Sequence, residues 1–582
     1  VGSFAEPASF RTGQLDAAAY APRPRQVRTA VAPVEVKVNA AGNTFIDFGR
    51  AAFGTVRLRV PGAAGGENVS VHLGEKKEGD DEVDRSPEGT IRYVKTTATL
   101  EPDGKWTTVA IPDYDNWPSI ADMPADIEQV APFRYVELYG LPAAISADDI
   151  EQLAVHTPWD EEASAFRSSD QVLNEVWELC KYSIKATSFA SVYVDGDRER
   201  LPYEADAYIN QLAHYGCEPA YALARFTHEW LIDHPTWPTE WKHHSILMAH
   251  ADWFYTGDTA SMERSWEGLK EKLFPGAERE DELVNPSTRD IVDWPRGERD
   301  GYQFVGYNTV VNAFQYRCLR AMAEMAEVLG KAGEAADFTA RADQLYASFN
   351  AVFWDVARQL YTDGEGTSHT SLHANMFALA HGLVPENRRD PVLAFIKGKG
   401  MACSVYGAHY LLEALFEQGE GPAAVELMRS TGQRSWFNMI RVGSTVTLEA
   451  WDIAFKGNLD WNHAWGAAPA AAIPRRVLGV RPLEPGFRVV KISPQPGPLT
   501  WIDGKVPTPL GPVEVRVSQD GDAGLTAAIN APAGCRLRID LPVPPDASGT
   551  VKLDGEAVSA TVANGRVRLP ELPAGAWLFE VE

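Results

Sequence analysis

The hydrophobic pattern changes period twice along this chain, and these two changes limit the possible folds more than any other feature. From about residue 31 to 155, short β-rich runs alternate with turn residues, which is typical of an antiparallel β-sandwich. Near Ser168 the period becomes helical and stays so for roughly 310 residues. After Pro485 strands return, separated by Pro and Gly. The pattern predicts a β domain, a helical domain and a second β domain.

The helical stretch contains eleven candidate helices, close to the twelve of an (α/α)6 toroid. They are Asp170–Thr187, Glu218–Asp233, His244–Tyr255, Ser261–Leu273, Asn308–Leu329, Glu334–Phe353, Ser371–Leu379, Pro391–Lys397, Gly407–Glu417, Gly421–Arg429 and Asn462–Leu478. Their lengths and patterns differ too much for a solenoid repeat. We therefore predict a multidomain α and β protein with an N-terminal antiparallel β-sandwich domain in residues 1–165, an (α/α)6 toroid in residues 166–482 and a C-terminal antiparallel β-sandwich domain in residues 483–582. One end of the toroid would carry the function.

The charge balance excludes two classes of partner. The chain of 582 residues has 54 Lys and Arg residues against 80 Asp and Glu residues, a formal net charge of −26. Such a charge repels phosphate backbones and anionic lipid surfaces, and no segment approaches the roughly 20 apolar residues of a membrane span. We expect neither nucleic acid nor membrane as a partner. The charged stretch Glu75–Glu88 fits a solvated loop better than a site.

The cysteines do not indicate a disulfide framework or a zinc site, because they are odd in number, scattered and without CxxC spacing. They are Cys180, Cys217, Cys318, Cys403 and Cys535. The chain begins at Val1 without a signal segment, so a leader removed by processing is one reading. The compartment stays open, with a periplasmic or secreted location favoured over the cytoplasm.

The densest polar cluster runs from Tyr193 to Asp206 and is predicted to be a loop between two helices. It holds five carboxylates and two arginines, interleaved with apolar residues such as Leu201 and with Tyr203. A solvated loop is one interpretation. The apolar residues favour partial burial instead, and buried carboxylates beside arginines acquire separated pKa values suited to acid and base roles.

A second cluster surrounds Glu449, a lone glutamate between the apolar run Val446–Leu448 and Trp451. A carboxylate in such a run is badly placed as a surface charge, so it is a candidate functional group. Its structural alternative is a salt bridge to Arg441 or to a neighbouring helix. The polar and aromatic stretch Asp460–Gly466 follows.

Two further loops combine carboxylates with tryptophans, the mixture that binds the hydroxyl groups and the apolar face of a sugar. The first contains Glu240 and Trp241, and the second contains Asp293 and Trp294. His373 could add hydrogen bonds, although its segment also fits a plain helix start.

The order of domains, the early D…ER…D motif and the late T…LE.WD…NHA.G motif resemble the α-L-rhamnosidases of glycoside hydrolase family 78. The resemblance covers roughly residues 35–582. It implies an inverting hydrolase in which Glu199 is the general acid and Glu449 the general base. The residues that we expect to bind substrate, from the resemblance or from the clusters above, are Asp195, Arg198, Tyr203, Asp206, Glu240, Trp241, Asp293, Trp294, His373, Trp451 and His463.

The early motif departs from the family pattern in two places. Family members have Cys-Pro-Gln-Arg before the catalytic Glu-Arg and Gly-Trp after it, whereas this chain has Gly196-Asp197-Arg198 and Pro202-Tyr203. The loop around the acid is shorter by about two residues and lacks the family tryptophan. We therefore expect the leaving-group side of the site to differ.

The predicted function is an inverting exo-glycoside hydrolase that releases a terminal sugar, α-L-rhamnose first among the candidates, with carbohydrate as its partner. Inversion needs one carboxyl that holds a proton and one ionised carboxylate that activates water. Neither a metal nor an organic cofactor is expected, and the sequence does not set the oligomeric state. The alternatives are a sugar phosphorylase, a lyase or isomerase on the same toroid, and a carbohydrate-binding protein without catalysis.

Overall fold

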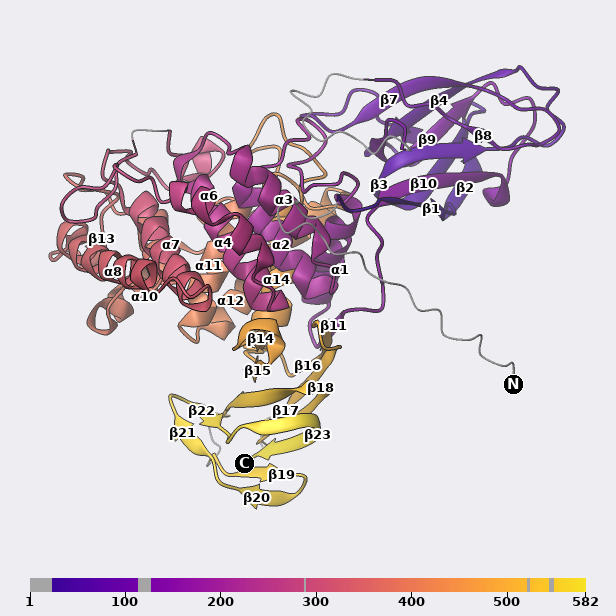
Figure 1. Ribbon diagram of the computed structural model, residues 1–582. Coiled ribbons are helices and arrows are strands. Elements are labelled where there is room, and N and C mark those ends of the chain that lie inside the picture. The colour runs from indigo at the N-terminus through magenta and orange to yellow at the C-terminus, as the bar shows by residue number, and fades with distance from the viewer. Residues whose placement is uncertain (1–22, 114–126, 287–288, 521–523, 544–548) are drawn as a thin grey trace.

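A computed structural model describes residues 23–113, 127–286, 289–520, 524–543 and 549–582 (Figure 1). Strands come first, helices occupy the middle of the chain, and strands return at its end. Figure 1 shows the N-terminal sheet in indigo and violet on one side of the helical body and the C-terminal sheet in yellow below it. The predicted order of β, α and β regions is confirmed. Among the described residues, no helix combines the length and apolar character needed to cross a membrane.

The N-terminal sheet has the order β1-β10-β3-β9-β4-β7, and β2 and β8 also pair with β3. Its strands are β1 Val27–Val31, β2 Glu35–Val38, β3 Thr44–Leu58, β4 Asn68–Gly74, β7 Tyr93–Thr99, β8 Thr107–Thr108, β9 Ala131–Tyr139 and β10 Ile150–His156, with a separate hairpin of β5 Lys77–Glu78 and β6 Glu82–Val83. The long strand β3 shifts register between Asp47 and Ala52. Such a bulge bends a strand, so β3 reaches four partners around one apolar core.

The helical region runs from α1 to the π-helical turn Ile473–Val477. Its helices are α1 Gln171–Ala186, α2 Glu204–Cys217, α3 Ala222–Asp233, α4 Thr239–Thr256, α5 Ala260–Arg264, α6 Trp266–Glu271, α7 Thr309–Val328, α8 Ala332–Val352, α9 Leu372–Ala380, α10 Arg389–Lys399, α11 Val405–Glu417, α12 Gly421–Met428, α13 Trp436–Arg441 and α14 Ala468–Ala472, and a small hairpin pairs β12 Trp354–Asp355 with β13 Leu360–Tyr361.

Six of these helices form a closed inner ring in which each packs against the next: α2, α4, α7, α9, α11, α14 and back to α2. Helices α1, α3, α8, α10 and α12 pack against members of the ring. This is the alternation of inner and outer helices that an (α/α)6 toroid requires. The closed ring of six helices confirms the predicted toroid.

Helix α2 and helix α13 were not predicted from the sequence. Every residue of α2 except Tyr208 is buried, because the helix lies in the inner ring between α4 and α14. The polar motif Tyr193–Asp206, which the sequence predicts to be a loop, overlaps the first turn of α2. The predicted helix Asn462–Leu478 was wrong at its start, since helical structure there begins with a 3₁₀ turn at Ala464.

The C-terminal sheet has the order β11-β16-β17-β18-β23-β19-β20, and β14, β15, β21 and β22 attach beside this path. Its strands are β11 Ala165–Ser168, β14 Val480–Pro482, β15 Val489–Ile492, β16 Trp501–Val506, β17 Val513–Asp520, β18 Gly524–Pro542, β19 Val551–Leu553, β20 Glu556–Val558, β21 Thr561–Ala563, β22 Arg566–Arg568 and β23 Leu572–Val581. All pairs are antiparallel apart from β15 with β18. Strand β11 precedes α1 in the chain yet pairs with β16 of this sheet.

Gly216 allows α2 and α14 to approach closely. A Cβ atom at this position would overlap the carbonyl oxygen of Ala470 and contact Pro474. We expect Gly216→Ala to lower the free energy of unfolding by about 1–3 kcal/mol through overpacking. Gly333→Ala is the matched control, because Gly333 lies exposed in α8 with open space around its Cβ position. The control should be stabilising by about 0.5–1 kcal/mol, since alanine is the better helix former. Urea unfolding followed by circular dichroism measures both, and equal effects would contradict the packing argument.

Candidate functional site

The inner helices begin at the same end of the toroid, and a pocket of about 190 Å³ lies there. Cross-links between helix starts establish this arrangement. Glu240 in the first turn of α4 and Asn308 at the N-cap of α7 both bind the segment 290–292. Asp206 in the first turn of α2 binds His463, just before α14. The residues that line the pocket are Asp195, Arg198, Glu199, Tyr203, Asp206, Trp237, Trp241, Ile291, Trp294, Glu449, Lys456, Asn458, His463 and Trp465.

Most of the residues predicted from the sequence lie in this lining. They are Asp195, Arg198, Glu199, Tyr203, Asp206, Trp241, Trp294, Glu449 and His463. Their positions along the chain are more than 250 residues apart at the extremes, so the closed ring is what brings them together. The interpretation of Asp206, Trp241 and their neighbours as loop residues was wrong, since both lie in first turns of helices.

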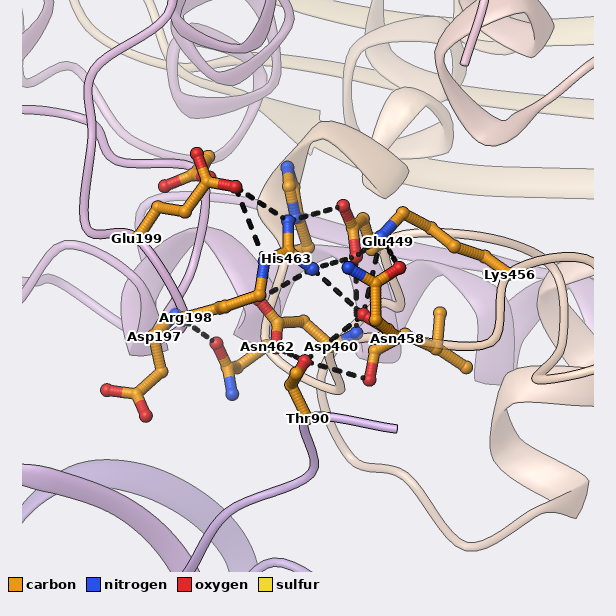
Figure 2. Close-up of polar contacts among 12 residues, drawn as sticks. Thr90, Asp197, Arg198, Glu199, Glu449, Lys456, Asn458, Asp460, Asn462 and His463 are labelled. Carbon is orange, nitrogen blue, oxygen red and sulfur yellow. Dashed lines mark hydrogen bonds and ion pairs between the residues drawn. The ribbon is translucent and has the colours of Figure 1, made fainter. Parts of the chain in front are cut away.

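Arg198 connects the two glutamates of the pocket (Figure 2). Its guanidinium donates to both oxygens of Glu449, at 2.8 Å from Nη1 and 2.9 Å from Nη2. The same Nη2 donates to Oε1 of Glu199 at 3.1 Å. The two Oε1 atoms therefore lie no farther apart than the sum of the two Nη2 distances, about 6.0 Å. Both carboxyl groups face one small volume.

Glu449 is buried and held by cations. Besides Arg198, the ammonium of Lys456 lies 3.0 Å from Oε2, and the backbone N–H of Asp460 donates to that oxygen at 3.3 Å. Burial alone would raise the pKa of Glu449, but the hydrogen bonds from Arg198 and the charges of His463 and Lys456 outweigh it and lower the pKa to about 2. Glu449 is therefore ionised at neutral pH.

Glu199 lies at the mouth of the pocket with 28 % of its side chain exposed, against 3 % for Glu449. The hydroxyl of Tyr203 donates to its Oε2 at 3.0 Å. Beside it, burial and then the negative charges of Glu199 and Asp206 raise the pKa of Asp195 well above its ordinary value. The repulsion between Asp195 and Glu199 favours a proton on this side of the pocket.

Two other acidic residues of the same motif, Asp197 and Glu204, point away from the pocket. Asp197 is paired with Arg92 and, at 2.7 Å, with Arg200. Glu204 accepts a hydrogen bond from the backbone N–H of Thr236 at 2.9 Å. Both have structural partners, so the motif divides into residues that face the pocket and residues that hold the loop.

Buried polar atoms without a partner face the pocket. His463 donates from Nε2 to Oδ1 of Asp206 at 2.7 Å, whereas Nδ1 of His463 and Oδ2 of Asp206 have no hydrogen-bond partner among the described residues. Buried polar atoms are normally paired. Together with the rings of Trp241 and Trp294 in the lining, they form a small polar cavity with aromatic walls, which suits a single sugar ring.

Four residues that we expected to bind substrate lie outside the lining of this pocket. Glu240, Asp293, His373 and Trp451 are fully buried. The carboxylate of Asp293 accepts hydrogen bonds from His373 Nε2 at 2.6 Å and from the backbone N–H of Ser404 at 3.0 Å. Trp451 donates from Nε1 to the carbonyl oxygen of Cys403 at 2.7 Å. Their partners are protein groups behind the pocket wall.

Glu240 and Asp293 position the segment that carries Trp294. Glu240 accepts hydrogen bonds from the backbone N–H groups of Ile291, at 3.0 Å, and of Val292. Val292 has a φ of 62°, an unfavourable conformation for a β-branched residue. Asp293 also accepts from the N–H of Trp294 at 2.8 Å. Such a strained backbone persists only where its surroundings fix it, and these carboxylates do so.

The N-terminal domain contributes to the site, which was not predicted from the sequence. Glu75 opens the stretch that we interpreted as solvated, yet it is buried and accepts hydrogen bonds from Asn462 Nδ2 at 2.9 Å and from the N–H of Arg92 at 2.7 Å. Asn462 in turn accepts from the N–H of Asp197 at 2.7 Å. The hydroxyl of Thr90 donates to Asp460. The first domain thus supports both motif loops.

The pocket residues Trp237, Ile291, Lys456, Asn458 and Trp465 were also not predicted. Lys456 sits in the run Asp452–Trp461, where nothing in the spacing marks one lysine as the partner of Glu449. Trp237 lies three residues before Glu240, but the sequence indicated only Glu240 and Trp241 as candidates there.

Glu449, Asp460 and His463 bring three potential metal-ligating atoms within 4.8 Å of one another. Arg198 and Lys456 already contact the carboxylate of Glu449. A metal ion would have to enter beside two cations, which electrostatic repulsion opposes. We assign no metal to this cluster.

Comparison with known families gives three matches that together span most of the chain. Residues 161–477 match the family model of the bacterial α-L-rhamnosidase six-hairpin glycosidase domain. The concanavalin-like domain of bacterial α-L-rhamnosidases matches residues 37–156, and their C-terminal domain matches residues 479–556.

Individual relatives agree with these matches at low identity. An α-L-rhamnosidase of Formosa agariphila is 22 % identical over 518 residues, which is 80 % of this chain and 54 % of the relative. One of Streptomyces avermitilis is 24 % identical over 530 residues, which is 83 % of this chain and 47 % of the relative. This chain spans about half the length of the sequence relatives it matches.

Solved structures share the fold. The α-L-rhamnosidase of Dictyoglumus thermophilum superposes with a TM-score of 0.81 at 20 % identity, covering 96 % of this chain and 64 % of that one. The Streptomyces avermitilis α-L-rhamnosidase in complex with L-rhamnose gives 0.77 at 19 % identity, covering 97 % and 54 %.

The buried carboxyl of Glu75 makes stability depend on pH. Burial raises its pKa to about 8 in the folded protein, against hydrogen bonds from Arg92 and Asn462 that lower it. The folded chain therefore keeps a proton that the unfolded chain loses, and this contribution, complete below the ordinary pKa of glutamate, is lost as pH rises through about 8. Between about pH 5 and 8, this group makes the unfolding free energy of the unchanged protein fall as pH rises. For Glu75→Gln we expect a less steep fall, with a slope smaller by about 1.4 kcal/mol per pH unit.

The matched control for this prediction is Glu88→Gln, at the other end of the same stretch. Glu88 is 45 % exposed and paired with Lys76, and the hydrogen bond from Lys76 lowers its pKa. Its contribution is lost only in acid, so the slope above pH 5 should match that of the unchanged protein. Chemical unfolding at a series of pH values measures the slopes. Identical slopes for all three proteins would refute a buried, titrating Glu75.

Proposed function

This chain belongs to the bacterial α-L-rhamnosidase family, and we propose that it is an inverting, exo-acting glycoside hydrolase that releases a terminal α-L-rhamnose. The observation that carries the proposal is the pair of glutamates bridged by Arg198, one buried and paired with cations, the other at the pocket mouth. Two carboxyl groups in unlike surroundings can serve as acid and base. Their Oε1 atoms lie within about 6.0 Å of each other, closer than the roughly 6.5–9.5 Å of inverting pairs, so the proposed inversion needs the two groups to move apart when a sugar displaces Arg198.

Glu449 is the proposed general base. Among the described residues, Oε1 accepts a hydrogen bond only from Arg198, and a carboxylate oxygen can accept a second one from water. The pKa of about 2 keeps it ionised, but also weakens it as a base. Part of its basicity would return as sugar hydroxyl groups draw Arg198 away, so binding and activation would be coupled.

Glu199 is the proposed general acid. Its place at the mouth puts the carboxyl where the glycosidic oxygen of an inserted terminal sugar would lie. Asp195, whose pKa burial raises, supplies a protonated neighbour. Tyr203 orients the carboxyl through its hydroxyl group. The proton passes to the leaving oxygen while Glu449 takes one from water on the opposite face of the ring.

The pocket supports exo action through its size. A volume of about 190 Å³ lies below the roughly 300–1,000 Å³ typical of sites for larger ligands. One sugar ring fits, with Asp206 and His463 as hydrogen-bonding groups. Asp293 and Glu240 act here as positioning residues.

Glu199→Gln removes the proposed proton donor while it keeps the shape of the side chain. On a natural rhamnoside we expect a loss of about 10² to 10⁴ in kcat. On 4-nitrophenyl α-L-rhamnoside the loss should be smaller, because nitrophenolate leaves without a proton. Steady-state kinetics on both substrates measures the difference, and equal losses would remove Glu199 from the acid role.

Glu449→Gln removes the proposed base, so kcat should fall by about 10² to 10⁴ on both substrates. KM should change less than kcat. Azide should restore turnover if it enters the water site, and proton NMR should then show glycosyl azide of inverted configuration. For the unchanged enzyme, NMR of the first product should show the anomer opposite to that of the substrate. Retention of configuration would contradict the proposed mechanism.

Measuring rhamnose release with and without phosphate tests the alternative that the protein is a sugar phosphorylase. Rhamnose release should be the same with and without phosphate, and no sugar phosphate should form. A phosphorylase would need phosphate to replace water, and the two cations nearest Glu449 are already paired with its carboxylate.

A further inference from the structure

A second groove of about 650 Å³ adjoins the rhamnose pocket, and Trp237 lines both. The groove is formed by the segment that follows Arg289 and by the loop around Phe304. Ile291 and Trp294 of that same segment line the pocket instead. The segment 289–299 thus lines both cavities, with different residues in each.

Three arginines line the groove. The guanidinium of Arg289 lies over the ring of Trp237 at 4.5 Å, and that of Arg299 lies over the ring of Phe304 at 5.0 Å. Arg296 completes the set. None of the three has an ion pair with a carboxylate within the described ranges. Arg299 donates instead to a backbone carbonyl oxygen.

The groove contains fewer carboxylates than arginines. Asp290 is its one carboxylate among the described lining residues, and its oxygen accepts a hydrogen bond from Asn308 at 2.7 Å. Three guanidinium groups therefore face one carboxylate on a chain whose net charge is −26. Arginines without a carboxylate partner suit oxyanions, which they bind with two hydrogen bonds.

The rhamnose pocket has the opposite balance. Four carboxyl groups line it, those of Asp195, Glu199, Asp206 and Glu449, against Arg198 and Lys456. A negatively charged sugar is therefore disfavoured in the rhamnose pocket and favoured in the adjoining groove. Trp237 and Phe304, each 42 % exposed, offer aromatic faces on which a sugar ring can stack.

We propose that the groove is the leaving-group subsite and that it takes a sugar bearing an acidic group, either a carboxylate or a sulfate ester. The proposal rests on the proposed rhamnosidase function. A neutral terminal rhamnose occupies the pocket, and the acidic sugar to which it is linked lies against Arg289 and Arg296. The shortened loop around Glu199 already indicated an unusual leaving-group side.

The test compares substrates that differ only beyond the rhamnose. They are a disaccharide of α-L-rhamnose on D-glucuronic acid, its counterpart on D-glucose, a rhamnosyl galactose sulfate, and 4-nitrophenyl α-L-rhamnoside. We expect kcat/KM for the acidic disaccharides to exceed that for the glucose compound by about tenfold at low salt. Raising NaCl from about 0.01 to about 0.15 M should erase most of the difference, since the Debye length falls from about 30 to about 8 Å. Comparing the glucuronic acid disaccharide with the rhamnosyl galactose sulfate shows whether the groove prefers a carboxylate or a sulfate ester.

The double variant Arg289→Gln with Arg296→Gln should remove the preference and leave the glucose and nitrophenyl substrates within about twofold of the unchanged enzyme. Arg50→Gln is the matched control, because Arg50 is also exposed and stacked on a ring, that of Tyr182 at 4.7 Å, but lies in another part of the molecule. It should change nothing.

The outcomes separate the two proposals. Cleavage of all rhamnosides at equal rates, or a double variant that keeps the preference, overturns the subsite while the rhamnosidase function stands. If no rhamnoside is cleaved, the function fails, and calorimetry with the glucuronic acid disaccharide then decides the groove alone. Binding that the double variant loses and Arg50→Gln retains supports it, and absence of binding to the unchanged protein overturns it.

Discussion

The parallel arrangement of the six inner helices is the constraint on which the rest of the site depends. Each inner helix presents its N-terminus, with its free N–H groups and partial positive charge, to the same end of the toroid. Acidic side chains gather where that charge stabilises them. Glu204 and Asp206 lie in the first turn of α2 and Glu240 in that of α4, and the carboxylate of Asp293 meets the N-cap of α11. The helix starts therefore offset part of the cost of burying these carboxylates, of which Asp206 lines the pocket and the others lie around it.

Arg198 works within that frame as a connector between halves of the chain. Its neighbours Asp197 and Arg200 tie the early loop to the N-terminal domain, and its own guanidinium reaches the late glutamate 251 positions away. Asn462 stands between Glu75 and the backbone of Asp197. The relative position of Glu199 and Glu449 is thus supported by two domains, although both carboxyl groups belong to one.

The sequence predicted the toroid from a change of period and marked Glu449 as a carboxylate among apolar and aromatic neighbours. Glu199 was one of five carboxylates in a polar cluster, and only the family resemblance distinguished it. The sequence could not place Asp293, His373 or Trp451, because a motif identifies residues that gather without saying which face the cavity. Helix α2 was missed because its first turn belongs to a polar motif that was predicted to be a loop. Glu75 was missed because a run of charges is typical of solvent, and only the docking of another domain buries its first member.

Strand β11 has a consequence for the order in which the protein is made. Ala165 pairs with Lys505, so a strand synthesised before the first helix waits for a partner from the far side of the helical domain. At typical rates of about 5–20 residues per second, the ribosome needs roughly 17–70 s to supply it. Until then β11 is an unpaired edge, open to wrong pairing. Its pairing with β16 ties the segment that enters the helical ring to a strand that follows the ring in the chain.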